Sequence, residues 1–189
     1  MEETLEKSRV WRSTPWRIAA WLAAAGVMLL PISIQAISGN FGWSIGDFVF
    51  VGVILFTSCF IFDLAARKAP NPSYLLGSAA ALAAGFGLVV VNGAVGLVGS
   101  EDEAHNLLFL TVIVVAIVGA VAARGRPEGM AAAMFAAGVS HLAISAALLI
   151  RAGGVSDGDP RMEILGLSIF GGIWLAAAWF FRHSSQDEL

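Results

Sequence analysis

Six apolar stretches, each near 20 residues long, dominate this sequence of 189 residues. An α-helix needs about 20 apolar residues to cross a hydrocarbon core of roughly 30 Å. The composition agrees, because 13% of the residues are charged, whereas soluble domains carry about 25%. We therefore predict an all-α membrane protein, a bundle of six transmembrane helices. The expected spans are 16–37, 45–66, 74–98, 107–123, 130–150 and 164–181.

The basic residues indicate the orientation. Nine of the eleven Lys and Arg residues fall on one side of the predicted spans, and only Arg151 and Arg161 fall on the other. The positive-inside rule then places both termini in the cytoplasm. We expect a cytoplasmic segment over 1–14, a transmembrane domain over 15–182 and a cytoplasmic tail over 183–189.

Two other interpretations of the chain stay open. Ala36-Ile37-Ser38 offers small residues for signal-peptide cleavage, but the apolar stretch before it is long enough to span, so we expect a retained first helix. Acidic-to-basic intervals of similar length recur along the chain and could indicate a triplicated helical hairpin. Helix-end charge preferences and the positive-inside rule explain these intervals more simply, so we favour that explanation.

Prolines and charged residues predict where helices begin, where one bends and where an ion pair forms. Pro15, Pro72 and Pro160 each follow a residue suited to cap a helix, and Pro31 is expected to kink the first span. Asp63 is spaced for an i,i+4 ion pair with Arg67 at the end of the second span.

Two segments match the capping box, in which a Ser and an acidic residue three positions later satisfy the first amides of a helix. Ser44 pairs with Asp47 in the first segment, and Ser100 pairs with Glu103 in the second. Both acidic residues therefore have a structural role to fill before any functional one.

The loop after the third span carries the densest acidic cluster, with Glu101, Asp102 and His105. On a helix starting at Ser100 the histidine lies three and four residues after the carboxylates, so the three side chains could share a face. Carboxylate and imidazole groups can hold a divalent cation or pass a proton. The alternative is a solvated helix start in which His105 pairs locally. Asp47 or Asn92 would have to supply further ligands.

Two polar residues fall inside predicted spans. Asn92 lies roughly 10 Å below the outer end of the third span, on a stripe with Gly85, Gly96 and Gly99. It is either a helix-packing contact or the floor of a polar pocket under the acidic loop.

His141 lies near the middle of the fifth span, where an ionisable group suggests function. It could act as a proton relay. Alternatively, it could be satisfied by an interhelical hydrogen bond to Thr57, Ser58 or Asn92.

The sequence lacks the motifs of several protein classes. It contains no zinc-type Cys/His spacing, no phosphate-binding glycine loop and no nucleophile elbow, and its single cysteine cannot form an internal disulfide. A membrane enzyme is therefore a weaker functional hypothesis than a ligand-binding protein or an accessory subunit. We also expect no nucleic-acid partner. The bilayer, a membrane-protein partner or a second copy of the chain are the expected partners.

The segments WSIGDF at 43–48, VNGAVG at 91–96 and GSED at 99–102, followed by Asn106, resemble a family of small multi-pass inner-membrane proteins of proteobacteria. This resemblance implies a bacterial inner membrane as the location. It implies no reaction, cofactor or catalytic residue.

The leading functional hypothesis is a polar pocket facing the periplasm that binds a cation or a small polar ligand, for transport or sensing. The residues expected to line it are Asp47, Asn92, Glu101, Asp102, His105 and His141. A divalent cation at Glu101, Asp102 and His105 is the possible cofactor. The alternative hypothesis is a non-catalytic accessory subunit of a larger membrane complex, suggested by the many glycine and alanine faces.

Overall fold

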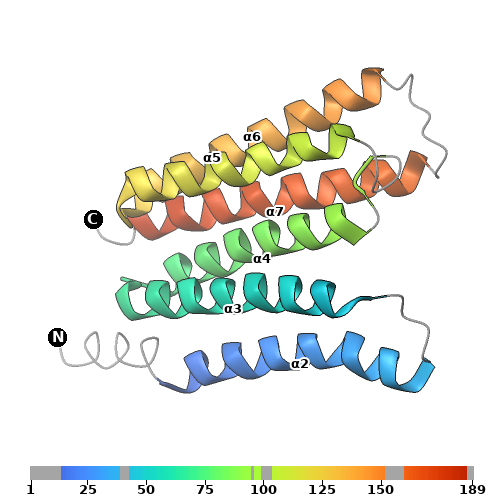
Figure 1. The fold of residues 1–189 in the computed structure, drawn as a ribbon. Helices are drawn as coiled ribbons and strands as arrows, with labels where there is room; N and C mark the ends of the chain where they lie inside the picture. Colours follow the sequence, from blue (N-terminus) through green and yellow to red (C-terminus); the bar gives the residue numbers. More distant parts are fainter. Residues whose placement is uncertain (1–13, 39–42, 95, 99–103, 152–159, 187–189) are drawn as a thin grey trace. The chain divides into compact units, whose positions relative to one another are not determined.

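The computed structural model describes residues 14–38, 43–94, 96–98, 104–151 and 160–186. It contains the α-helices α2 (Thr14–Ser38), α3 (Ile45–Lys68), α4 (Pro72–Ala94), α5 (Leu108–Ala123), α6 (Pro127–Arg151) and α7 (Pro160–Gln186), and the 3-10 helix η1 (Ala104–Leu107). No β-strand occurs in these ranges. Figure 1 colours the helices in chain order, from blue for α2 to red for α7.

The prediction of six spans is confirmed. Six helical segments of the described chain are long and apolar enough to cross a membrane, and each corresponds to a predicted span. Large apolar side chains remain exposed along the helices, among them Ile37, Ile45 and Ile150, each at least 80% exposed. A soluble protein rarely leaves this much apolar surface in water, whereas lipid is a suitable solvent for it. The chain is a multi-pass membrane protein.

The helix ends show which local signals were correct. Prolines occupy the first position of α4 and α7, as predicted, and Pro127 also begins α6. The predicted end of the third span at residue 98 is wrong, because α4 ends at Ala94 and Gly96 follows with a positive φ of 73°. Glycine adopts this left-handed conformation without steric cost, so the chain leaves the helix here.

The residues before Pro72 form a compact unit (Met1–Asn71) in which α2 packs against α3. Their contact includes a buried carboxylate, because Asp63 is only 8% exposed and binds arginines from both helices. Arg17 of α2 donates from Nε to Oδ1 and from Nη2 to Oδ2, the latter over 3.1 Å. Arg67 donates to Oδ2 over 2.8–2.9 Å, which confirms the predicted i,i+4 pair.

Residues Pro72–Leu189 form a second compact unit. Within it α7 packs against both α4 and α6, and α5 packs mainly against α6. Figure 1 shows α7 between α4 and the α5–α6 pair. The interior of this unit therefore lies along α7, where side chains from α4 and α6 meet it.

Small residues allow the helices of this second unit to approach closely. A Cβ added at Gly119 of α5 would lie 2.6 Å from Ala133 Cβ of α6, and one added at Gly138 of α6 would lie 2.9 Å from Leu175 of α7. Helix association in lipid depends on van der Waals packing, which close backbone approach strengthens. Gly119 and Gly138 thus serve helix packing inside this unit.

The Asp63 cluster predicts an ordered series of stability losses. Asp63→Ala leaves two arginines without their shared partner and should cost about 2–4 kcal/mol. Arg17→Ala should cost less, and Arg67→Ala least, because Arg17 is 27% exposed and Arg67 is 57% exposed. Unfolding by SDS titration of the detergent-solubilised protein measures the order. A larger loss for Arg67→Ala than for Asp63→Ala would contradict the assignment.

Candidate polar site in α4 to α7

Asn106 holds the segment that follows α4. Its side-chain Oδ1 accepts hydrogen bonds from the backbone amides of Leu97 and Val98, each over 3.1 Å. Its Nδ2 donates to the carbonyl of Val98 over 3.2 Å. Asn106 is only 2% exposed, so water cannot supply these bonds. One amide side chain thereby satisfies three backbone groups that no regular secondary structure pairs.

Asn92 connects the end of α4 to the same segment. Its Nδ2 donates to the backbone carbonyl of Asn106 over 3.1 Å. Because α4 ends at Ala94, Asn92 lies about 3 Å from the helix end, and the expected depth of roughly 10 Å is wrong. Its Oδ1 is buried and has no hydrogen-bond partner among the described residues. Asn92 is thus a loop anchor with an unused acceptor.

His141 is fully buried in the interior of the second unit. It lies 14 residues after the start of α6 at Pro127, about 21 Å along the helix axis, and 10 residues before its end at Arg151. Its Nε2 is 3.1 Å from the backbone carbonyl of Leu167 in α7. The expected interhelical bond therefore exists, but its acceptor is none of the three side chains that we expected.

The tautomer of His141 follows from this contact. A carbonyl oxygen only accepts, so Nε2 must carry a proton, and in the neutral ring Nδ1 is then an acceptor. Nδ1 is buried and has no hydrogen-bond partner among the described residues. Burying a polar atom without a partner costs about 1–3 kcal/mol. The contact with Leu167 accounts for Nε2, but no contact among the described residues accounts for the burial of Nδ1.

Aromatic rings surround His141 on two sides. The centroid of Phe109 in α5 lies 5.1 Å from that of the imidazole, and the centroid of Phe170 in α7 lies 6.3 Å away. Ser145, one turn further along α6, donates its hydroxyl to the backbone carbonyl of His141 over 2.8 Å and does not reach the ring nitrogens. The imidazole therefore lies in a mainly apolar environment, in which any hydrogen bond to Nδ1 gains strength.

Trp174 supplies a third unpaired polar atom to the same interior. It is 2% exposed, and its Nε1 has no acceptor among the described residues. Its side chain is packed between α4 and α6, because its indole lies 3.8 Å from a Cβ built on Gly85 and its own Cβ lies 3.3 Å from one built on Gly138. Among the described residues, Trp174 thus contributes an unpaired donor to an interior in which Asn92 and His141 each contribute an unpaired acceptor.

These three atoms are distributed along the length of the interior. Trp174 and Phe170 lie one turn apart on α7, and they contact α4 at Gly85 and Gly87. His141 faces Phe170, so it lies between the level of Trp174 and the level of Asn92. From Gly85 to Asn92 is about 10 Å along α4. The polar groups therefore lie at different levels along the helices.

The acidic residues expected at the mouth of the pocket lie in different parts of the chain, and the structure describes only one of them. Asp47 lies in the first unit, where its carboxylate accepts from the Ser44 amide over 2.7 Å and the Ser44 hydroxyl accepts from the Asp47 amide over 3.3 Å. The capping box predicted at Ser44 is confirmed. Glu101 and Asp102 lie outside the described residues, together with the capping box predicted at Ser100.

His105 lies half-buried in η1, immediately before Asn106. The described residues contain no group of three His, Cys, Asp or Glu side chains arranged to hold a metal ion. Because two of the three expected ligands are outside that part of the chain, the divalent cation stays a prediction. The described structure places Asn92 and His141 in the interior of one unit.

Sequence reasoning missed Asn106 and Trp174 as members of the polar interior. Asn106 was noticed only as part of the resembling segments, although an Asn in a short interhelical connection is a common backbone-satisfying residue. From the sequence alone, Trp174 is expected to be an ordinary packing or lipid-facing residue. The signal for Trp174 was its spacing, one turn from Phe170 on the face that meets His141.

A comparison of the chain with protein-family models, curated proteins and solved structures finds no match in any of the three. The resemblance inferred from the sequence therefore stays a prediction.

Asn106→Ala should destabilise the second unit by about 2–4 kcal/mol, because it leaves two amides and one carbonyl unpaired. Asn92→Ala removes a single donated bond and should cost about 1 kcal/mol, which makes it the matched control. SDS titration gives both values. Backbone amide exchange at Leu97 and Val98 should accelerate in Asn106→Ala alone. Equal losses in the two variants would contradict the role of Asn106.

Two adjacent glycines of α7 test the packing around His141. A Cβ at Gly171 would lie 2.5 Å from Leu142 Cδ2 and 3.5 Å from His141 Cδ2, whereas one at Gly172 has no heavy atom within 4 Å. Gly171→Ala should cost about 1–3 kcal/mol by separating α6 from α7. Gly172→Ala should stabilise α7 by up to about 1 kcal/mol.

Nitrogen NMR of the His141 ring measures the effect of each substitution on the hydrogen bond between α6 and α7. The bond from Nε2 to Leu167 should weaken in Gly171→Ala and stay unchanged in Gly172→Ala. Identical stabilities and identical ring signals in the two variants would contradict this close contact.

Proposed function

We propose that this multi-pass membrane protein binds a small hydrogen-bonding ligand, or passes a proton, in the interior of the α4–α7 unit, as a transporter or a sensor. The proposed location is a bacterial inner membrane, with both termini in the cytoplasm and the Asn92 end facing the periplasm. The uneven distribution of Lys and Arg supports that orientation.

The unpaired Nδ1 of His141 is the observation that carries the proposal. An ionisable side chain at mid-span is costly and rarely retained without a function. If packing were its only role, an apolar residue of similar volume would avoid the cost of the unpaired nitrogen. A ligand that donates a hydrogen bond to Nδ1, or a proton that arrives there, removes that cost.

The charge of the interior narrows the class of ligand. Among the described residues of the α4–α7 unit, no carboxylate is buried, and the buried side chains that carry polar atoms are Asn, Ser, His, Tyr and Trp. A metal ion held deep in such an interior would keep its charge uncompensated. The deep site therefore favours a neutral polar molecule or a proton. A cation would bind nearer the mouth, where Glu101, Asp102 and His105 are the candidate ligands.

His141→Ala in proteoliposomes provides the test. Proton flux is followed with an entrapped pH-sensitive dye, and the permeation of urea and glycerol is followed by light scattering. Zinc binding to the detergent-solubilised protein is measured by equilibrium dialysis. We expect proton flux or solute permeation in the wild type, and we expect His141→Ala to lower that activity by tenfold or more. Glu101→Ala should affect only zinc binding.

His183→Ala is the matched control, because it makes the same substitution at an exposed position that stacks on Trp179 near the end of α7. It should behave as the wild type. Asn92→Ala provides a second variant of the site if His141→Ala folds poorly. The proposal is wrong if the wild type and all variants match empty liposomes and bind zinc equally.

The second candidate function is a non-catalytic accessory subunit of a larger membrane complex. Four helical glycines favour it, because a Cβ built on any of them meets no heavy atom within 4 Å: Gly26, Gly93, Gly166 and Gly172. Small residues that face open space allow another helix to approach closely. Extraction in a mild detergent followed by native mass measurement distinguishes the two functions. A reproducible heteromeric partner supports the subunit role, and a homo-oligomer or monomer opposes it.

A further inference from the structure

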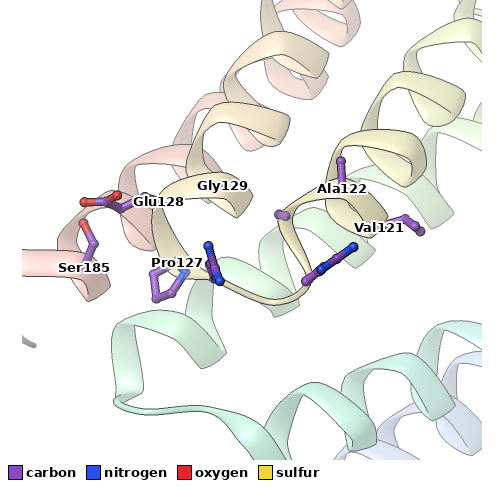
Figure 2. A pocket seen from close by; sticks show the side chains of 9 residues that line it. Val121, Ala122, Pro127, Glu128, Gly129 and Ser185 are labelled. Atoms are coloured by element: carbon purple, nitrogen blue, oxygen red, sulfur yellow. The ribbon is translucent and has the colours of Figure 1, made fainter.

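A basic pocket opens at the end of the α4–α7 unit where α5 turns into α6. Its volume is about 920 Å³, and it is lined by Val121, Ala122, Ala123, Arg124, Arg126, Pro127, Glu128, Gly129 and Ser185. Figure 2 shows Glu128 and Ser185 at one end of this basic pocket and Val121 and Ala122 at the other. A volume in this range accommodates a small ligand or a lipid headgroup.

The two arginines of the basic pocket have no acidic partner. Arg124 and Arg126 are both exposed, and neither forms an ion pair with a described carboxylate, including Glu128 in the same lining. Two arginines against one glutamate leave the lining with a net positive charge. Arginine matches the geometry of phosphate oxygens through paired N–H donors. The charge and the donors favour a phosphate group.

The first turn of α6 adds uncapped donors to the same lining. Arg126 precedes Pro127, and its carbonyl accepts from the Met130 amide over 2.9 Å, so Arg126 occupies the N-cap position. An arginine side chain cannot accept a hydrogen bond from the amides of the first turn, as Ser, Thr, Asp or Asn would. The amides of Glu128 and Gly129 thus lack a side-chain acceptor, and an anion could supply it.

The apolar wall of the basic pocket distinguishes a lipid from a free anion. Val121 is 72% exposed and belongs to the last turn of a membrane-spanning helix. The apolar surface of α5 therefore continues directly into the arginine-bearing turn. A phospholipid has this same sequence of groups, an acyl chain followed by a phosphate. Basic sites at the ends of transmembrane helices are suited to anionic headgroups.

We propose that the basic pocket binds the phosphate of an anionic membrane phospholipid, with its acyl chain along Val121 and Ala122. Arg124, Arg126 and the amides of Glu128 and Gly129 hold the phosphate oxygens. Glu128 opposes the negative charge and limits the affinity. This site is separate from the polar interior and does not depend on the function proposed for His141.

Native mass spectrometry of the full chain in detergent tests this site by titration with dioleoylphosphatidylglycerol. We expect the variant carrying both Arg124→Gln and Arg126→Gln to bind this lipid roughly 30-fold more weakly than the wild type, at about 1 kcal/mol for each arginine near a headgroup. Lys68→Gln removes one positive charge at an exposed position outside the basic pocket and should bind as the wild type does. Glu128→Gln should bind more tightly.

Two further probes separate the sources of phosphate. Dioleoylphosphatidylcholine should bind more weakly than phosphatidylglycerol, and inorganic phosphate at millimolar concentration should not displace the bound lipid. Displacement by inorganic phosphate would overturn the lipid assignment in favour of a free anion. Equal lipid binding by the wild type and the double arginine variant would overturn the site itself. If the double variant unfolds, unchanged binding by Glu128→Gln would overturn it instead.

Discussion

The absence of water from the hydrocarbon core is the constraint on which this structure depends. Every buried polar group must find its partner within the chain, because lipid offers none. Helices pair most backbone amides and carbonyls with one another. The groups that still need a partner lie where a helix ends. Asn106 satisfies it after α4, where its side chain pairs with the amides of Leu97 and Val98 and with the Val98 carbonyl. Without that amide the connection from α4 to η1 would require water at a buried position.

The same constraint explains why glycine and histidine occur together in α6 and α7. The imidazole of His141 reaches the Leu167 carbonyl only if the two helices lie close. Gly171 permits that approach on one helix and Gly138 on the other, since an added Cβ would meet side chains at 2.5 Å and 2.9 Å, respectively. The hydrogen bond between His141 and Leu167 therefore depends on the close packing of α6 and α7. A change that separates the helices also removes the partner of the histidine.

The sequence predicted the helical spans well and the polar contacts poorly, for a physical reason. Apolar length alone identifies a span, and a proline at the first position identifies its start, as at Pro72 and Pro160. Local pairs such as Asp63 with Arg67 and Ser44 with Asp47 also follow from helical spacing. Arg17 with Asp63 and His141 with Leu167 join residues far apart in the chain. No local pattern encodes such pairs, and a backbone acceptor leaves no mark in the sequence.

Asn92 Oδ1, His141 Nδ1 and Trp174 Nε1 are buried without a hydrogen-bond partner among the described residues. At about 1–3 kcal/mol each, their combined cost is comparable to the whole stability of many proteins. They are spread over about 10 Å, so one water molecule cannot pair all three. A small ligand, or several waters in a row, could pair with them in turn. This separation along the helices is the reason why the proposed ligand is a proton or a small polar molecule rather than a tightly bound ion.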